Sequence, residues 1–303
     1  MSRSVALQLL QSLIPGLRSE GFEAAEPSGK QYHWESQISS GSDQLKLQVY
    51  YGKKGIKTVI QGKTNTLLYQ KVQEAVSGKS SNEKTEDIEE PDYYIGSDES
   101  GKGDYFGPLV TAAVFTTPQI RKSLQKVGIR DSKQISDATI MDYYRKIVQT
   151  PGVTFSYRVV IPSLYNQLYK TCQNLNLMLT KLHIETIQDQ IVASKCKVAI
   201  LDQYGNAEKT AREAKSIPGL RLIQTTNAER FTGVAAASVV ARKHFLDWMH
   251  SFGQRLGHPI PKGAGGDADD FAKLIYSKYG SEVLIKMVKL HFKNSEKWSG
   301  LLP

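Results

Sequence analysis

Apolar and polar residues follow two different periods over the first 79 residues. Over residues 5–14 the apolar side chains recur at helical spacing, and Pro15-Gly16 predicts the end of that helix. Every second residue is apolar over residues 45–51, which is typical of a half-buried strand. A Gly-Lys-Lys-Gly turn then leads into the β-prone residues 56–60, so we expect a hairpin.

A further helical pattern over residues 67–76 completes this part of the chain, and residues 1–79 are expected to form a small α+β domain. Residues 80–92 follow with one lysine, six acidic residues and no aromatic residue. This composition predicts an acidic, flexible linker, because it offers little apolar surface to bury. Residues 93–303 form the second predicted domain.

Strands and helices are predicted to alternate in the second domain. The predicted strands are residues 93–98, 109–115, 154–160, 198–202 and 220–225, and the predicted helices are residues 119–126, 136–149, 163–170, 177–193, 232–250, 269–278 and 281–288. This order predicts an α/β fold in which helices are layered on a sheet.

The charge of the chain favours a polyanionic partner. The formal net charge is +9 and the pI is about 9.3. Residues 1–79 contain ten basic and six acidic residues, and residues 93–303 contain 28 basic and 18 acidic residues. Both domains are therefore basic, which favours attraction to the phosphates of a nucleic acid.

Cysteine content and the N-terminus indicate the compartment. Cys172 and Cys196 form no CxxC pair, so neither a zinc site nor a disulfide framework is expected, and such sparse thiols suit a reducing cytosol. The first residues are too polar for a secretory leader. No apolar run approaches the roughly 18 residues of a membrane span. We expect a cytoplasmic monomer with no membrane partner.

Residues 95–108 give the clearest evidence in the sequence for a catalytic site. Asp98 and Glu99 come at the end of a predicted strand and directly precede Gly101-Lys102-Gly103. Carboxylates in this position suit a hard divalent cation such as Mg²⁺, and glycines beside a lysine allow peptide N–H groups and an ammonium to reach a phosphate. Metal and phosphate sites side by side favour phosphoryl chemistry.

Two other interpretations of this segment are a P-loop and a solvated acidic turn. The segment that begins at Gly96 fits the P-loop pattern GxxxxGK[ST] up to the last position of the pattern. At that position Gly103 offers no hydroxyl for Mg²⁺. In addition, Asp98 and Glu99 would lie inside the phosphate cradle and repel its ligand. The other interpretation is a solvated acidic turn at a strand end, which is common for an isolated segment of this kind.

The segment from Gly96 to Val110 resembles the signature strand and turn of the type 2 ribonucleases H. The lysine between two glycines is similar to ribonuclease HIII, since ribonuclease HII usually has arginine there. Further segments match the family in order, and the resemblance covers about residues 93–298. These segments are Asp131-Ser132-Lys133, Leu201-Asp202, Asn227-Ala228-Glu229, residues 235–242 and residues 289–294.

The resemblance implies a fold and an activity. The fold is the ribonuclease H-like mixed sheet flanked by helices, preceded by a small α+β domain resembling half of the TATA-binding protein. The implied activity is hydrolysis of the RNA strand of an RNA–DNA hybrid, which leaves 5′-phosphate and 3′-hydroxyl ends. Two divalent ions, Mg²⁺ or Mn²⁺, suit this reaction because one activates water and the other stabilises the leaving oxygen.

Four carboxylates are expected to hold these ions. Asp98 and Glu99 follow from the motif, and Asp202 ends the apolar run 198–201. On spacing alone, Asp202 would be taken as a turn cap, and the resemblance reverses that interpretation. The fourth is Glu229, at a position where the family often has aspartate and some ribonucleases HIII have glutamate. Glu213 and Asp247 are the alternative candidates for this fourth carboxylate.

Other residues are expected to contact the substrate. Around the motif they are Ser100, Gly101, Lys102 and Gly103, which would read the 2′-hydroxyl and a phosphate. Elsewhere they are Ser132, Lys133, Ser238 and Arg242, together with Lys53, Lys54, Lys57 and Lys63 of the first domain. Arg242 either contacts a phosphate of the substrate or extends along the rim of the site toward solvent, and the two interpretations are equally supported. His183, on an apolar helix, is interpreted as a core histidine rather than a general acid.

Two alternative functions stay open. One is incision at single ribonucleotides within duplex DNA, as in ribonuclease HII. The other is a non-catalytic nucleic-acid-binding protein that keeps the fold without the chemistry.

Overall fold

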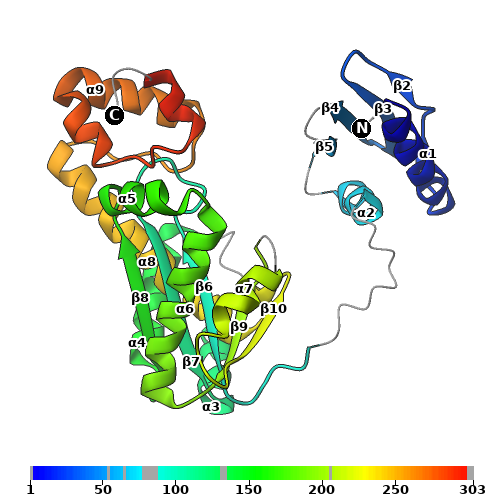
Figure 1. Ribbon diagram of the computed structural model, residues 1–303. Helices are drawn as coiled ribbons and strands as arrows, with labels where there is room; N and C mark the ends of the chain where they lie inside the picture. Colours follow the sequence, from blue (N-terminus) through cyan, green and yellow to red (C-terminus); the bar gives the residue numbers. More distant parts are fainter. Residues whose placement is uncertain are drawn as a thin grey trace. The chain divides into compact units, whose positions relative to one another are not determined.

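The computed structural model describes residues 3–52, 55–63, 66–76, 88–129, 135–204 and 207–298. The chain divides into two compact units, Met1–Glu89 and Glu90–Pro303, and each is described by itself. Figure 1 shows their elements. Most of the predicted linker, residues 80–87, lies outside the described residues.

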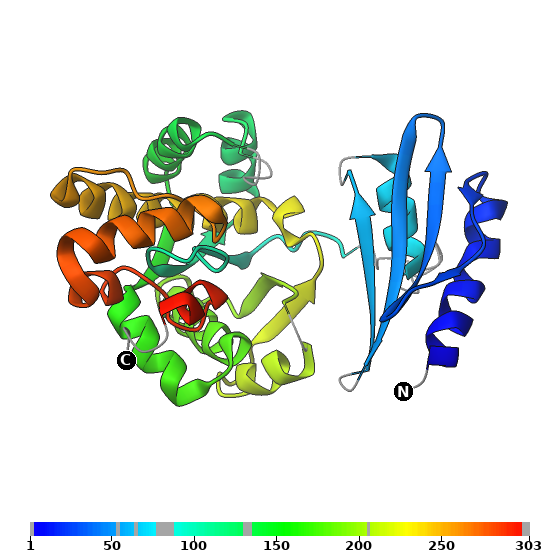
Figure 2. The same ribbon diagram turned by 90° about the horizontal axis from the view of Figure 1, so that it is seen from above.

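The N-terminal unit is an antiparallel sheet with two helices. Along the chain its elements are α1 (Arg3–Ser19), β1 (Glu23–Ala24), β2 (Ser28–Gly29), β3 (His33–Ser40), β4 (Asp43–Gly52), β5 (Gly55–Gly62) and α2 (Leu67–Val76). The strand order is β1-β3-β4-β5, with β2 paired to β3, and Figure 2 shows the long strands side by side. The predicted hairpin is confirmed as β4 and β5, whose ladder runs from Leu45 opposite Gly62 to Gly52 opposite Gly55.

The predicted end of the first helix at Pro15-Gly16 is wrong. The helix continues through Pro15 to Ser19, and Glu20 N donates to Gly16 O at 3.2 Å. A proline inside a helix costs one hydrogen bond and some steric strain. Leu17 lies beyond the proline and is fully buried against the sheet together with Leu10 and Ile14. Burial of this leucine, about 1.5–3 kcal/mol, offsets much of the cost.

The C-terminal unit is built on a mixed five-stranded sheet, which confirms the predicted fold class. Its strands are β6 (Tyr94–Ser100), β7 (Leu109–Thr116), β8 (Thr154–Val160), β9 (Val198–Asp202) and β10 (Arg221–Thr225). The order is β10-β9-β6-β7-β8. The pairs β6·β7 and β7·β8 are antiparallel, whereas β9 runs parallel to both β6 and β10. β6, the first of these five strands in sequence, therefore lies at the centre of the sheet, and β9 lies directly beside it.

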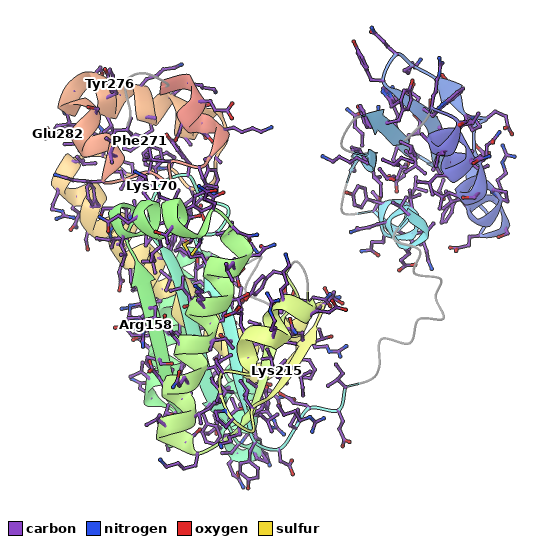
Figure 3. The ribbon with its side chains drawn as sticks, viewed as in Figure 1. Arg158, Lys170, Lys215, Phe271, Tyr276 and Glu282 are labelled. Carbon is purple, nitrogen blue, oxygen red and sulfur yellow. The ribbon has the colours of Figure 1, made fainter. Side chains whose placement is uncertain are left out.

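Helices cover both faces of this sheet (Figure 1). They are α3 (Pro118–Lys126), α4 (Asp137–Gln149), α5 (Pro162–Cys172), α6 (Leu175–Ser194), α7 (Ala207–Ala214), α8 (Thr232–Leu256) and α9 (Gly266–Ile285). The long helices α6 and α8 both pack on β6 and β7. Arg158 of β8 pairs with Asp189 of α6 at 2.7 Å and ties α6 to the edge strand (Figure 3). Among the described residues, no helix is long and apolar enough to cross a membrane.

The predicted helices 269–278 and 281–288 lie within α9, on either side of a kink at Gly280, whose φ of 77° and ψ of 178° are not helical. The predicted break between them is therefore confirmed. The element ends at Ile285 rather than at residue 288, because Met287 and Val288 are buried and Val288 bridges Phe106. Phe271 of α9 also packs edge-on against Phe106, with ring centroids 5.3 Å apart (Figure 3). The helix α7 and strand β3 were not predicted.

Small residues allow α8 to lie very close to β6. A Cβ added to Gly96 would lie 2.2 Å from the carbonyl carbon of Gly233, and one added to Gly233 would lie 2.8 Å from the Tyr94 ring. The alanines 235–237 are buried at the same interface. Their small side chains leave α8 free to approach the sheet closely.

Replacing Gly96 by alanine should therefore destabilise the C-terminal unit strongly. The new Cβ would meet backbone atoms of α8, which cannot retreat as a flexible side chain could. We expect the free energy of unfolding to fall by about 3 kcal/mol or more, measured by urea denaturation.

The matched control is Gly266→Ala in α9. No atom lies within 4 Å of the added Cβ, and the backbone there is not left-handed. This variant should change the free energy of unfolding by less than about 1 kcal/mol. Equal stability of the two variants would contradict the close packing of α8 on β6.

Candidate active site

The four predicted carboxylates meet at one end of the sheet. Asp98 and Glu99 lie near the end of β6, and Asp202 is the last residue of the parallel neighbour β9. Ser97 pairs with Leu201, so Asp98 and Asp202 lie at the same level of the two strands. Glu229 lies in the 3-10 segment Ala228–Arg230 that follows β10.

These carboxylates line one cavity together with some of the residues that are expected to contact substrate. Its volume is about 280 Å³. The lining residues are Asp98, Glu99, Ser100, Gly101, Lys102, Gly103, Asp202, Glu229 and Ser238. Residues spread over 141 positions of the sequence are therefore brought together.

Asp98 is held from the α8 side of the sheet. Its carboxylate accepts hydrogen bonds from Glu99 N at 2.8 Å and from the side chain of Ser238. Burial, then the neighbouring charge of Glu99, raise the pKa of Asp98 well above its usual value, and the charge of Asp202 adds to this effect. The two hydrogen bonds oppose the shift without cancelling it. Ionisation of Asp98 is thus poorly compensated in the protein without metal.

Glu99 is held from the other side of the same strand. One carboxylate oxygen, Oε1, lies 3.2 Å from Lys102 Nζ, and the other, Oε2, lies 3.2 Å from His183 Nε2. Burial raises the pKa of Glu99, but the hydrogen bond and charge of His183, followed by those of Lys102, outweigh it and lower the pKa to about 2. Glu99 is therefore ionised at any physiological pH.

Asp202 positions the segment that carries Glu229. Its Oδ1 accepts a hydrogen bond from Ala228 N at 3.2 Å. Asn227 precedes this segment in the left-handed conformation, with φ of 56°, which asparagine tolerates better than most residues. The carboxylate of β9 thus fixes the turn that brings Glu229 to the cavity.

The loop of residues 101–103 requires its first glycine. Gly101 has φ of +86°, and a Cβ there would lie 2.1 Å from Pro108 O. No atom lies within 4 Å of a Cβ added to Gly103, so the backbone there is open to a ligand. Lys102 lies between them, with its ammonium 4.9 Å from the centre of the Tyr204 ring.

His183 is the contact that the sequence interpretation missed. It is fully buried, as expected for a core histidine, yet it touches a predicted catalytic carboxylate. Its other ring nitrogen, Nδ1, lies 2.8 Å from Ser97 Oγ. No local pattern in α6 could reveal this, because Glu99 is 84 positions away in sequence.

Other predicted contacts lie elsewhere or outside the described residues. Arg242 is not among the residues that line the cavity, and it pairs with Asp137 at 3.5 Å. Lys57 and Lys63 are exposed in the N-terminal unit. Ser132, Lys133, Lys53 and Lys54 lie outside the described residues. These assignments stay predictions. Of the two substitutes for Glu229, neither Glu213 nor Asp247 lines the cavity, and Asp247 pairs with Lys243 at 2.6 Å.

The donor set fits a hydrated divalent cation. Within the described ranges, no group of three or more Asp, Glu, His or Cys side chains is placed to enclose a metal ion by itself. The cavity instead offers carboxylate oxygens in an open lining, with the charge of Asp98 uncompensated. Mg²⁺ typically binds one or two carboxylates and keeps waters or substrate phosphates as its other ligands.

Comparison with known proteins identifies the family to which the chain belongs. A family model described as ribonuclease HII matches residues 95–295. The match begins within β6, ends at residue 295 and includes all four carboxylates. The chain therefore belongs to the type 2 ribonuclease H family, a family of endoribonucleases.

Relatives that match most of the chain are ribonucleases HIII. The ribonuclease HIII of Protochlamydia amoebophila is 31% identical over 293 residues, which cover 95% of this chain and 92% of that protein. The Chlamydia muridarum ribonuclease HIII is 38% identical over 259 residues, 78% of this chain and 85% of that protein. The crystal structure of Bst-RNase HIII in complex with Mn²⁺ has a TM-score of 0.65 at 28% identity, with 96% of each chain covered. That of Aquifex aeolicus RNase H3 has a TM-score of 0.56 at 27% identity, covering 94% of this chain and 97% of that one.

Ionisation of Asp98 is expected to lower the stability of the protein without metal. A pKa raised by folding means that the folded state binds the proton more tightly, so stability is lost as pH rises through the folded pKa. Asp98→Asn removes this charge. In EDTA at pH 8, we expect the variant to be more stable than the parent by about 1–3 kcal/mol, measured by urea denaturation. The difference should shrink as pH falls toward the usual pKa of aspartate.

Asp270→Asn is the control, since Asp270 is exposed and pairs only at the surface with Lys273. Its effect should stay below about 0.5 kcal/mol at every pH. A parent protein more stable than Asp98→Asn at pH 8 in EDTA would contradict the uncompensated charge.

Proposed function

We propose that this chain is a ribonuclease HIII that hydrolyses the RNA strand of RNA–DNA hybrids with two divalent metal ions, Mg²⁺ or Mn²⁺. The products are 5′-phosphate and 3′-hydroxyl ends. The observation that carries the proposal is the single cavity lined by Asp98, Glu99, Asp202 and Glu229 and bordered by residues 101–103. The Mn²⁺ complex of Bst-RNase HIII supports the choice of metal.

The carboxylates would hold the metal ions at the ends of β6 and β9. When bound, such ions activate a water molecule and stabilise the departing oxygen of the phosphodiester. The chain's own residues orient this site: Ser238 holds Asp98, His183 and Lys102 hold Glu99, and Asp202 holds the segment of Glu229. Preorganised groups of this kind lower the barrier because they need little rearrangement during reaction.

The loop of residues 101–103 is proposed to recognise the RNA strand. Backbone N–H groups of Gly101 and Gly103 can approach a 2′-hydroxyl, which DNA lacks. Lys102 lies at the same cavity with its side chain 36% exposed, so its ammonium can exchange Glu99 for a substrate phosphate. In ribonuclease HII arginine is usual at this position, and the lysine favours the HIII assignment.

The N-terminal unit is proposed to bind the hybrid through the open face of its sheet. One face of β3 and β4 packs on the helices, so alternate residues form the opposite face. On that face Gln37, Lys46 and Gln61 lie in register across three strands, as do His33, Tyr50 and Lys57. A polar surface with two lysines and a tilted ring contact between His33 and Tyr50 suits a phosphate backbone. Accordingly, residues 1–79 are proposed as the substrate-binding domain, 80–92 as the linker and 93–303 as the catalytic domain.

The deciding experiment uses two labelled duplexes, an RNA–DNA hybrid and a DNA duplex with one ribonucleotide, each with Mg²⁺, Mn²⁺ or EDTA. We expect metal-dependent cleavage of the hybrid and no cleavage in EDTA. Asp98→Asn and Asp202→Asn should lower the cleavage rate at least about 100-fold while hybrid binding persists. Asp247→Asn, outside the cavity, should cleave like the parent protein.

Each outcome has a different meaning. Incision at the lone ribonucleotide would assign ribonuclease HII activity. Binding without cleavage under every metal condition would indicate a binding protein, and near-normal turnover of Asp98→Asn or Asp202→Asn would exclude the proposed site.

Deleting residues 1–79 should raise KM for the hybrid more than it lowers kcat. The deletion removes binding that is equal in ground and transition states, so we expect KM to rise about 10-fold and kcat to change less than about threefold. Glu90, which accepts hydrogen bonds from Tyr94 Oη and Thr232 N, is retained. The measurement is steady-state kinetics at several salt concentrations.

The double variant Lys46→Ala/Lys57→Ala should reproduce part of the KM increase. Lys71→Ala is its control, because Lys71 lies on α2 and pairs with Glu20 and Glu74. An unchanged KM in the deletion would mean that this unit serves another purpose.

A further inference from the structure

His183 spans two residues that share one face of β6. Its Nδ1 lies 2.8 Å from Ser97 Oγ and its Nε2 lies 3.2 Å from Oε2 of Glu99. Residues two apart on a strand point to the same face, so an imidazole from α6 can lie across both. The ring is fully buried, and these are contacts within the interior of the sheet–helix layer.

The direction of the bond to Glu99 follows from its acceptor. An ionised carboxylate only accepts hydrogen bonds, so Nε2 must carry the hydrogen. Nδ1 is less constrained, because Ser97 Oγ lies 2.8 Å from both Nδ1 and Ala112 O and can direct its single proton to either. His183 therefore donates to Glu99 whichever way the serine hydroxyl points.

The ring is held by more than its two nitrogens. Tyr204 stacks on it, with ring centroids 5.4 Å apart and an interplanar angle of 27°. Tyr204 is itself fixed, because its hydroxyl donates to Thr180 Oγ1 at 3.3 Å. A donor restrained in this way can hold a carboxylate in one orientation.

The two oxygens of Glu99 consequently have different surroundings. Oε2 is tied to the buried His183, whereas Oε1 contacts Lys102, whose side chain is 36% exposed in the cavity. Lys102 can leave Oε1 when a substrate arrives, but His183 cannot leave Oε2 without unpacking the layer.

We propose that His183 is a positioning residue that fixes the Glu99 carboxylate through Oε2 and so presents Oε1 to a divalent cation. The inference rests on the proposed function, in which Glu99 holds metal. Partners that hydrogen-bond to metal ligands commonly change metal affinity or activity 10- to 100-fold when removed. Such an effect separates positioning from simple filling of the core.

The test compares His183→Asn with His183→Gln in the full-length protein. The asparagine amide nitrogen can occupy the place of Nδ1 near Ser97, whereas the longer glutamine places its amide nitrogen near Nε2 and can still donate to Glu99. Both variants lose the stacking on Tyr204, and asparagine also lacks one methylene of glutamine, so their packing loss is compared by melting temperature. Isothermal titration with Mn²⁺, without nucleic acid, measures metal affinity, and thermal melting measures stability.

We expect His183→Asn to bind Mn²⁺ at least about 10-fold more weakly and His183→Gln to retain affinity within about threefold of the parent. Hybrid cleavage should follow the same order in kcat, with little change in KM. Equal Mn²⁺ affinities of the two variants at similar melting temperatures would overturn the inference. If the parent protein neither binds Mn²⁺ nor cleaves the hybrid, the proposed function fails instead.

A measurement on the parent protein covers the case in which both variants unfold. Nitrogen-15 spectra of the six histidines report which ring nitrogen carries hydrogen. A hydrogen on Nε2 of His183 is required. A ring protonated at Nδ1 alone cannot donate to Glu99 and would overturn the inference.

Discussion

Successive residues of a strand point to opposite faces of its sheet, and the active site depends on this constraint. Asp98 and Glu99 are adjacent, so they cannot be held by the same layer of the fold. Ser238 of α8 bonds to Asp98 on one face, and His183 of α6 bonds to Glu99 on the other. Both helical layers must therefore be packed before the two carboxylates are oriented. This explains why a very short sequence motif requires a complete sheet–helix sandwich around it.

Electrostatics then separates the roles of these carboxylates. The chain is basic as a whole, yet four acidic residues line one cavity. Lys102 and His183 compensate Glu99, whereas Asp98 receives only neutral donors and lies beside Glu99 and Asp202. Burying an uncompensated charge is costly, and a divalent cation is the simplest group that relieves it. The same imbalance that lowers the stability of the metal-free protein thus creates affinity for metal and for the phosphate that accompanies it.

Strong local patterns predicted much of this fold and site. The strand predicted at residues 198–202 coincides with β9, and the alternation over residues 45–51 is part of β4. Residues 98–103, from which the site was predicted, line one cavity together with Asp202 and Glu229. Failures came where tertiary packing overrides a local signal: the first helix continues past Pro15 because Leu17 is buried beyond it. The role of His183 could not be predicted, because it exists only once α6 lies on β6.

The hydrogen bond between Asp202 and Ala228 N links two parts of the site that are distant in sequence. Asp202 is both a member of the carboxylate group and the acceptor that fixes the turn before Glu229. A change at position 202 would therefore displace its neighbour as well as remove its own charge. The energetic contributions of the two positions are consequently not independent, and a double-mutant cycle between them should depart from additivity.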